Sequence, residues 1–569
     1  MAPLVLDTFT NMRDGALRLL FLLLFPLASC ASQYYVSPTG NDANSGTLLA
    51  PWLTGNHAQA IVHPGDTVYF RSGKYTNMAI QTTAGTSGSP ITFKAYPGER
   101  PLIQSLTNGS AHAIGLSKNY YILDGFSTSG GLAGIGLYNS SFSIIQNCDV
   151  HDSYGNGISV AFNGATNNII RNCRVYNTTL MNWPRTYTNG WGGGISIASG
   201  AHGCLVENCV AYFIHGEGIL VGGVNRGTIR NCIVSDTFRT HLYSNGGDNL
   251  LEGNIVYSTR ANEVDLNNNV LETSIEVTDE GDASTYIYGA IGERGNRVVN
   301  NLAISGGGTV LSMNVQDYYP TNYMWSDCFV GNNTLVGGGS EIGLNDPYGT
   351  NGFGNNLHIV NNLVLKAGSA ALVSARPVIG TNTIDIGNNL YLFYPVGTFV
   401  KWDTNSAYWH TASTASNWML WSGETNVGPR ASTWITDTNA ATNIIANVFQ
   451  SAAALPRMWA TNGGPVPEIN MDAIFADLST CSNKIAALRQ QLAAPFRPIN
   501  IATNPVIGSG RQFPTWTYVN DYGVTNTVAP ITTDLLGNVR FGNPTLGALE
   551  PRPKGLQPPS DLRVLSPGP

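Results

Sequence analysis

Glu263 and Asp265 are acidic residues separated by one position, a spacing that can serve catalysis if the segment is a strand. In a strand, residues two apart share a face and lie about 6.5–7 Å apart. Two carboxylates at that separation suit the acid and base of a glycoside hydrolase, and they could equally share a calcium ion. This pair makes Ca2+ the one candidate cofactor, with Glu263 and Asp265 as its ligands. No motif in the sequence specifies another cofactor. A solvated acidic face is the structural alternative.

Arg239 and His241, together with Glu217 one repeat earlier, are further candidates for catalysis. Removal of a proton from a substrate that carries a carboxylate needs a base and a cation that neutralises the carboxylate. His241 could supply the base and Arg239 the cation, whereas Glu217 could act in a hydrolase. The structural alternatives are that Glu217 satisfies corner amides and that Arg239 pairs with Asp236. The acidic run that begins at Glu276 is expected to be a solvated loop.

Aromatic and polar side chains that could hold a sugar gather in an inserted segment and on the strands after it. The insertion, LMNWPRTYTNGW at residues 180–191, lengthens one repeat by about 13 residues, and insertions in repeat folds map to loops on one face. Aromatic rings stack on sugars and arginine binds carboxylates. The loop could instead fold back on its own aromatics. The expected substrate-binding residues are Trp183, Arg185, Tyr187, Trp191, His215, Tyr243, Tyr286 and Tyr288.

An asparagine followed by cysteine or an aliphatic residue recurs in an apolar frame and indicates the elements that must position these side chains. The copies are marked by Asn147, Asn172, Asn208, Asn231 and Asn254, with weaker ones at Asn301, Asn333, Asn362 and Asn389. A period near 23 with short β-branched runs and Asn/Gly corners predicts a solenoid of strands. We therefore predict an all-β fold, a single-stranded right-handed parallel β-helix of about 10–12 turns with a C-terminal cap.

The residues that recur in each copy of the repeat also predict what lies inside the β-helix. The stacked asparagines are expected to hydrogen-bond from turn to turn. The cysteines at the next position are expected to form an inward stack of thiols: Cys148, Cys173, Cys209 and Cys232. The step of 47 residues from Asn254 to Asn301 is twice the basic period, which predicts one degenerate copy between them.

Strand alternation then assigns the candidate residues to faces. Apolar residues at Ile158, Ile195, Ile219 and Leu242 are expected to point inward. With a side-chain period of two, this register directs His241 and Tyr243 outward. One turn on, Val264 and Leu266 are expected inward, which turns Glu263 and Asp265 outward. The following strand is expected around Ile287, with Tyr286 and Tyr288 on its outer face. A slip of one residue would reverse every face.

Composition narrows the class of protein. Only 11% of the 569 residues are charged, the formal net charge is −7, and no basic patch or tail is present, which excludes a nucleic-acid partner. Four of the 8 cysteines share the repeat column, so we expect buried thiols instead of a disulfide framework. No Cys/His spacing indicates zinc.

The N-terminus has the pattern of an export signal. Arg13 and Arg18 precede an apolar run at residues 19–27, and the run is followed by Leu-Ala-Ser-Cys ending at Cys30. Such a run is too short to span a bilayer. The last four residues resemble the bacterial lipoprotein box, which implies lipidation of Cys30, a membrane partner through that lipid, and a place at the cell surface or in the periplasm, as an outer-membrane lipoprotein. The alternative is ordinary cleavage near Ala31 and free secretion, with Met12 as a second candidate start.

Two segments near the N-terminus carry a resemblance to a known superfamily. They are QYYVSPTGNDANSGTLLAPW at residues 33–52 and PGDTVYFRSGKY at residues 64–75. They resemble the opening of bacterial right-handed β-helix proteins of the pectate-lyase-like superfamily, over about residues 33–400. The resemblance implies a polysaccharide substrate, cleaved by β-elimination of uronate chains.

The catalytic motifs of that superfamily do not transfer to this chain. Its lysines are Lys74, Lys94, Lys118, Lys366, Lys401, Lys484 and Lys554, so none falls between residues 147 and 333 to act as a lyase base. The motifs of polygalacturonases and mannuronan epimerases are also absent. A glycoside hydrolase that uses a Glu/Asp pair and a non-catalytic glycan-binding surface protein or adhesin therefore remain alternatives to the lyase. We expect a monomer.

The chain divides into four expected regions. Residues 1–30 are a signal peptide, residues 31–400 the β-helix, residues 401–550 a C-terminal region that caps the last turn, and residues 551–569 a disordered tail. A helix is expected within the capping region at about residues 470–492.

Overall fold

The computed structural model describes residues 31–551 of the chain. Within that range the segments not described are 108, 163, 184–191, 224–225, 260–272, 280–293, 306–307, 316–325, 338–339, 346–355, 366–369, 375–383, 393–399, 404–408, 413–432, 436–468, 477–480, 501–502, 520–523 and 541.

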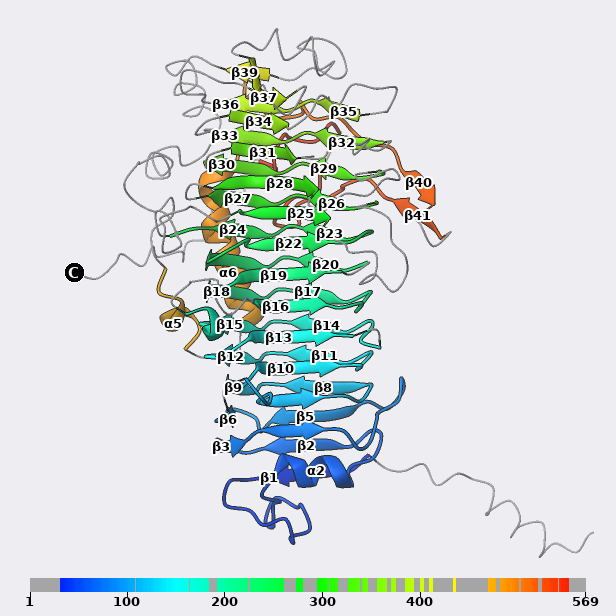
Figure 1. Ribbon diagram of the computed structural model, residues 1–569, viewed down its shortest axis with the longest axis vertical. Helices are drawn as coiled ribbons and strands as arrows, with labels where there is room; N and C mark the ends of the chain where they lie inside the picture. The colour runs from blue at the N-terminus through cyan, green and yellow to red at the C-terminus, as the bar shows by residue number, and fades with distance from the viewer. Residues whose placement is uncertain are drawn as a thin grey trace, which may run out of the picture.

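Three long sheets of 13 strands each form the sides of a coil (Figure 1). Every turn contributes one strand to each sheet, and the strands pair in parallel with the turns before and after. Sheet 1 begins with β1, which precedes the first full turn, so its remaining 12 strands give twelve turns. The expected parallel β-helix is confirmed, with the number of turns in the described part at the top of the expected range.

The strands of each sheet follow in spatial order. Sheet 1 contains β1 Gln33–Val36, β2 Thr67–Phe70, β5 Ile91–Ala95, β8 Tyr121–Asp124, β11 Ile144–Gln146, β14 Ile169–Arg171, β17 Leu205–Glu207, β20 Thr228–Arg230, β23 Leu250–Glu252, β26 Arg297–Val299, β29 Phe329–Gly331, β32 Leu357–Val360 and β35 Ile384–Gly387. Sheet 2 contains β3 Gly73–Thr76, β6 Pro101–Ser105, β9 Ser127–Gly130, β12 Asp149–His151, β15 Arg174–Tyr176, β18 Val210–Ile214, β21 Ile233–Thr237, β24 Ile255–Tyr257, β27 Leu302–Ser305, β30 Thr334–Gly337, β33 Leu363–Leu365, β36 Leu390–Leu392 and β39 Thr433–Ile435. Sheet 3 contains β4 Met78–Ile80, β7 Ile114–Leu116, β10 Ala133–Tyr138, β13 Asn156–Ala161, β16 Gly193–Ala198, β19 Glu217–Gly222, β22 Leu242–Asn245, β25 Ile275–Asp279, β28 Thr309–Val315, β31 Ser340–Asn345, β34 Ala370–Ser374, β37 Val400–Asp403 and, antiparallel at its edge, β38 Trp409–Ala412.

The apolar interior follows from side-chain alternation along these short strands. Ile158, Ile195, Ile219 and Leu242 align across β13, β16, β19 and β22, and all four are fully buried. This confirms the inward register predicted for sheet 3 up to Leu242. At the N-terminal end, helix α2 (Gly55–Ile61) closes the first turn, with Ala58 fully buried in the same core as Phe70.

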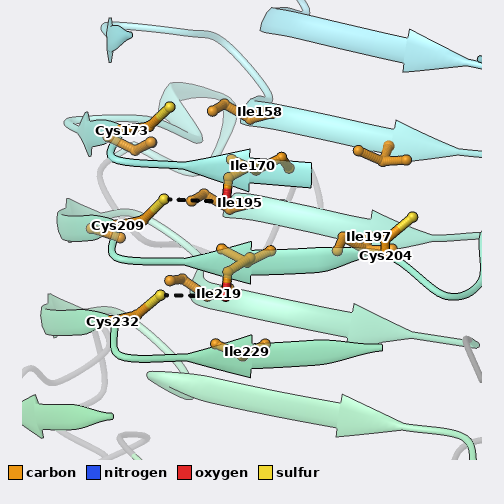
Figure 2. Packing of buried hydrophobic residues seen from close by; sticks show 14 of the residues in the cluster. Ile158, Ile170, Cys173, Ile195, Ile197, Cys204, Cys209, Ile219, Ile229 and Cys232 are labelled. Atoms are coloured by element: carbon orange, nitrogen blue, oxygen red, sulfur yellow. Dashed lines mark hydrogen bonds between the residues drawn. The ribbon is translucent and has the colours of Figure 1, made fainter. Parts of the chain in front are cut away.

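The thiol stack lies where it was expected. Cys148, Cys173, Cys209 and Cys232 are fully buried at the corner between sheets 1 and 2. Figure 2 shows Cys209 and Cys232 one above the other, and their Sγ atoms lie 3.8 Å from backbone carbonyl oxygens of the preceding turn. Seven cysteines fall within the described residues, and all seven are free and buried.

The asparagine column differs from its prediction by one position. Asn147, Asn172, Asn208 and Asn231 take left-handed backbone conformations, with φ between 51° and 57°, and form the corner itself. Asn tolerates this conformation better than most residues.

The hydrogen-bonded stack instead continues the cysteine position. It consists of Asn254, Asn301, Asn333, Asn362 and Asn389, in which each backbone N–H donates to the next side-chain oxygen at 2.8–3.0 Å. Each side-chain Nδ2 also donates to that oxygen, at 3.0–3.1 Å.

The expected degenerate copy between Asn254 and Asn301 is not found. Strand β23 pairs directly with β26, with Leu250 beside Arg297, so the 47-residue step is a single turn. The extra length lies between the strands of that turn, in segments that include residues 260–272 and 280–293. Insertions, and not a second repeat, therefore explain the doubled spacing.

The C-terminal segment lies along the side of the coil. Helices α5 (Met471–Ile474) and α6 (Cys481–Ala493), within the expected helical range, are followed by the 3₁₀ turn η3 (Ala494–Phe496) and the hairpin of β40 (Trp516–Val519) and β41 (Thr525–Val528). Figure 1 shows α6 alongside sheet 2 and the hairpin beside sheet 1. The described part of residues 469–550 thus lies along the sides of the coil. The expected cap over the last turn stays a prediction, because most of residues 401–468 lie outside the described residues.

Arginines anchor this returning segment to the corners of distant turns. Arg489 donates to Asn231 Oδ1 at 3.0 Å, and Arg540 donates to Asn300 Oδ1 at 2.9 Å. Both arginines are buried. No helix in the described residues is long and apolar enough to cross a membrane.

Candidate active site

The outer face of sheet 3 carries the candidate residues that the structure brings together. Leu220, Tyr243 and Glu276 occupy equivalent positions on β19, β22 and β25. Each alternates with an inward neighbour, Ile219, Leu242 and Ile275 respectively, so all three side chains start outward. Leu220 and Tyr243 are nonetheless only 7% and 5% exposed, and Glu276 is half-buried.

The direction of Glu217 follows from the glycine beside it. Gly193 pairs with Glu217, and a Cβ atom on Gly193 would meet Leu220 Cδ2 at 2.4 Å, on the outer face one turn later. By the same geometry the Cβ atom of Glu217 starts on the outer face, the face that carries Tyr243. Thr240 occupies the equivalent place in the next turn, and its Oγ1 indeed donates to Glu276 Oε2 at 2.7 Å.

Two acidic residues therefore lie on the strands that flank β22. Glu276 reaches back to Thr240, and Thr240 lies one strand, about 4.8 Å, from Glu217. Tyr243 stands between the two glutamates, and its phenol oxygen lies 3.4 Å from Asn245 Nδ2, a donor that is itself 93% buried. Two carboxyl groups on the strands beside a phenol supply the acids and bases that a proton-transfer site needs.

His241 does not lie on this face, which corrects its predicted orientation. His241 occupies the position that Gly218 has one turn earlier. A Cβ atom added at Gly218 would lie 2.4 Å from Val234 Cγ1 and 3.1 Å from Thr237 Cγ2, both towards the interior. At the start of β13, β16, β19 and β22 the strict alternation is thus broken, and two consecutive residues point inward. His241 is fully buried, and this burial lowers its pKa to about 4, against the opposing effect of Asp236 and of backbone hydrogen bonds.

The neighbouring corner residues have structural contacts. Arg239 is half-exposed at the corner before β22, where its backbone N–H donates to Gly216 O at 3.1 Å. Asp236, the alternative partner suggested for Arg239, accepts hydrogen bonds from the backbone and the hydroxyl of Thr259, both at 2.8 Å. Arg239 thus lies just before the strand that carries Tyr243.

Trp183 and His215 form a contact at the same end of the sheet. Trp183 is 65% exposed after the 3₁₀ turn η1 (Leu180–Asn182), and its ring meets the ring of His215 edge-on at 4.8 Å. His215 is buried just before β19, with Nε2 3.2 Å from Asn177 Oδ1. A largely exposed indole beside His215, just before β19, suits stacking on a sugar.

The acidic pair that opened the sequence argument does not occupy its expected strand. The strand after β22 in sheet 3 is β25 and the next is β28, so residues 264–266 and 286–288 do not provide them. Glu263, Asp265, Tyr286 and Tyr288 lie outside the described residues, as do Arg185, Tyr187, Trp191 and Cys30. The described residues include no group of three or more His, Cys, Asp or Glu side chains that could hold a metal ion.

Glu276 is the residue that sequence reasoning missed. It was assigned to a solvated acidic loop, yet it lies in β25, aligned with Tyr243. The sequence Ser-Ile-Glu-Val-Thr at residues 274–278 has an alternating apolar pattern that could have identified the strand.

Comparisons with known proteins support the fold. Residues 34–254 match a family model described as a Pel9A-like right-handed β-helix region. This match and the parallel sheets confirm the right-handed parallel β-helix predicted from the sequence. The matched range is less than half of the chain, and it includes Glu217, Arg239 and Tyr243 but ends before Glu276.

Relatives in sequence cover only short stretches. Pectate lyase PEL9 of Emericella nidulans is 41% identical over 86 residues, which is 15% of this chain and 20% of the relative. The uncharacterized protein YwoF of Bacillus subtilis is 42% identical over 69 residues, 12% of this chain and 15% of the relative. The chain thus spans a fifth or less of the length of these two relatives.

Among solved structures, pectate lyase Pel9A matches with a TM-score of 0.47 and 15% identity, covering 92% of this chain and 97% of that one. A mannuronic acid specific family 6 polysaccharide lyase from human gut microbiota matches with a TM-score of 0.43 and 15% identity, over 80% and 99% of the chains.

Proposed function

We propose, from the premise that residues 34–254 form a Pel9A-like right-handed β-helix, that the protein cleaves a uronate-containing polysaccharide by β-elimination on the outer face of sheet 3. The observation that carries this proposal is that Glu217 and Glu276 lie on the two strands that flank Tyr243 on this face, with Thr240 donating to Glu276. A relative named as a pectate lyase adds support for the substrate class.

The residues can be given roles in the elimination. A base removes the proton from C5 of the uronate, the C4–O bond breaks, a C4=C5 double bond forms, and the leaving oxygen takes a proton. His241 is fully buried and cannot reach a substrate, so we assign the base to Glu217. Tyr243 would protonate the leaving oxygen. Arg239 would neutralise the substrate carboxylate, which makes the C5 proton more acidic.

A glycoside hydrolase is the second candidate, and the same two carboxylates favour it. Glu217 and Glu276 would then act as the acid and base of hydrolysis, a role first assigned to Glu263 and Asp265. Calcium remains a candidate cofactor only through Glu263 and Asp265, and no step in either mechanism depends on it. A non-catalytic glycan-binding protein would keep the face but produce no product.

The products on uronate polymers distinguish these functions. A lyase yields an unsaturated uronate with ultraviolet absorbance, whereas a hydrolase yields new reducing ends without it. For the lyase, Glu217→Gln is expected to lower the rate of unsaturated product by about 100-fold or more, the usual worth of a general base. Glu207→Gln is the matched control, because Glu207 is a half-buried carboxylate on sheet 1 that pairs with Arg230.

Each result has a defined reading. Equal losses in the two variants would place the base elsewhere and contradict the assignment of Glu217. Reducing ends alone would support the hydrolase, and retained binding with neither product would support the binding protein. Repeating the assay with and without added Ca2+ tests the cofactor.

The proposed location follows from the N-terminal sequence. We propose a protein that crosses the inner membrane and is held by a lipid on Cys30, at the cell surface or in the periplasm. A Cys30→Ser variant is expected to move from the membrane fraction to the soluble fraction. If the wild-type protein is already soluble, ordinary cleavage near Ala31 is the correct processing.

A further inference from the structure

A cavity of about 720 Å³ lies on the outer face of sheet 1, on another side of the coil from Glu217 and Tyr243. Its floor is formed by side chains from β23, β26 and β29, and its walls by the returning C-terminal segment around Arg511–Trp516 and Val528–Thr533. Figure 1 shows the β40–β41 hairpin beside these strands. The cavity is therefore formed only when the C-terminal segment lies against the coil.

Aromatic rings form one side of the cavity. Phe329 from β29 meets Phe513 edge-on at 5.0 Å and Trp516 at 5.6 Å. His358 from the next turn lies 5.6 Å from Trp516 and 5.3 Å from Phe513. Phe513 and Trp516 remain partly exposed, so their faces are accessible to a ligand. Half-exposed aromatic rings at a cavity are the usual platform on which a sugar stacks.

The lining is also cationic, in a protein whose net charge is −7. It contains Arg297, Arg511 and Arg540 against the single acidic residue Glu252. Arg511 pairs with Asp385, and Arg540 pairs with Glu550. Arg297 is half-buried, and its guanidinium makes no ion pair or hydrogen bond to the described part of the chain. It is therefore the charge that a ligand could neutralise.

Two further donors at the cavity lack an acceptor. Trp516 Nε1 and Arg511 Nε are buried and have no hydrogen-bond partner in the structure described. Buried donors without acceptors are costly and are normally satisfied. A ligand rich in hydroxyl and carboxylate oxygens could supply the acceptors that the protein does not.

We propose that this cavity is a second carbohydrate site, which binds a carboxylate-bearing sugar of an acidic polysaccharide. The sugar ring stacks on the half-exposed aromatic side chains, and its carboxylate pairs with Arg297 in the fork geometry that arginine offers. The inference shares its ligand class with the proposed function. It does not depend on cleavage, because the two sites lie on different sheets.

Binding of trigalacturonate to the full-length protein, measured by calorimetry, tests this site, with neutral maltotriose as the comparison ligand. Arg297→Gln is expected to weaken the binding of trigalacturonate by about tenfold or more, as loss of a charge-assisted pair would. Trp516→Phe keeps a ring but removes the Nε1 donor, so a smaller loss is expected. Arg230→Gln is the matched control: Arg230 lies on the same face of sheet 1, outside the cavity lining, and pairs with Glu207.

Cleavage and thermal stability are measured on the same variants. Unchanged unfolding temperatures, with cleavage retained in Arg297→Gln, would show that the loss is local to the cavity. Loss of cleavage in Glu217→Gln with binding at Arg297 intact supports both proposals. Absence of cleavage in the wild type, with Arg297-dependent binding, supports the cavity and refutes only the proposed function.

Three results would overturn the inference. They are equal binding of trigalacturonate by the wild type and Arg297→Gln, equally tight binding of maltotriose, and no binding of trigalacturonate at millimolar concentration.

Discussion

One interior position of the coil is filled by two different chemistries in its two halves. From the fourth to the seventh turn it holds the thiols of Cys148, Cys173, Cys209 and Cys232. From the eighth turn it holds the amides of Asn254, Asn301, Asn333, Asn362 and Asn389. All nine side chains are fully buried, so the position requires a small side chain but not a particular polarity.

The two halves differ in what each side chain requires of its neighbours. A thiol contacts a carbonyl oxygen of the preceding turn at a long 3.8 Å and loses little if its neighbour changes. An amide in the stack satisfies its donors and acceptors only if the next turn also presents an amide. The thiol half is therefore held by weak contacts between stacked thiols and to backbone carbonyl oxygens, whereas the amide half is one network of full hydrogen bonds.

The change occurs between the seventh and eighth turns, where the backbone N–H of Cys232 donates to Asn254 Oδ1 at 3.0 Å. In the seventh turn another interior column changes, because His241 replaces the glycine found at Gly218. Tyr243 and Glu276, on the outer face, belong to these same two turns. The candidate site is thus built at the junction between the two halves.

The largest expected effect comes from breaking the amide network. Replacement of Asn301 by Ala removes the acceptor of Asn254 N–H and Nδ2 and leaves a buried cavity, so we expect a loss of about 3–4 kcal/mol in the free energy of unfolding. Denaturant unfolding followed by circular dichroism measures it. The matched change in the thiol half, Cys209→Ala, is expected to cost about 1–2 kcal/mol. Equal costs would show that the two chemistries are equivalent.

An effect on the order of 3 kcal/mol is expected from the buried imidazole of His241. Its pKa is about 4 in the folded state and 6.5 when unfolded, so the stabilising contribution is complete above pH 6.5 and is lost as the pH falls towards 4. A His241→Leu variant cannot charge and should lose less stability between pH 7 and about 4.5 than the wild type. Parallel pH profiles of unfolding for the two proteins would contradict this prediction.

The smallest effect is expected at the junction. Cys232→Asn extends the network by one member, because its Nδ2 could donate to Asn254 Oδ1, and we expect a change within about 1 kcal/mol. The same substitution at Cys173 has thiols on both sides and should cost about 2–3 kcal/mol, since its donors find no amide. Denaturant unfolding of the Cys232→Asn and Cys173→Asn variants tests this. An equal loss in the free energy of unfolding would mean that an asparagine beside Asn254 does not join the hydrogen-bonded stack.

The sequence was sufficient for the fold because the interior alternates simply. Ile158, Ile195, Ile219 and Leu242 recur at the turn period, and they fixed the register of sheet 3 correctly. The asparagine copies were misaligned by one residue, because corner and interior positions both hold asparagine in Asn-Asn pairs such as Asn332-Asn333.

The candidate site was harder to predict, for three physical reasons. At the corner before β22 the alternation breaks, so His241 points inward although its neighbour Leu242 does too. Insertions doubled one repeat, which moved the eighth strand of sheet 3 from around Glu263 to Glu276. Spacing alone cannot distinguish an insertion from a degenerate repeat, since both lengthen the chain by a similar amount.

The returning C-terminal segment has a consequence for cooperativity. In a coil each turn pairs only with its neighbours, so turns can open one at a time from an end. Arg489 and Arg540, near the end of the chain, join the corners at Asn231 and Asn300, which lie in turns formed much earlier in synthesis. Opening these turns must also release the segment. This segment, which is synthesised after those turns, would thus convert a stack of separable turns into a single folding unit.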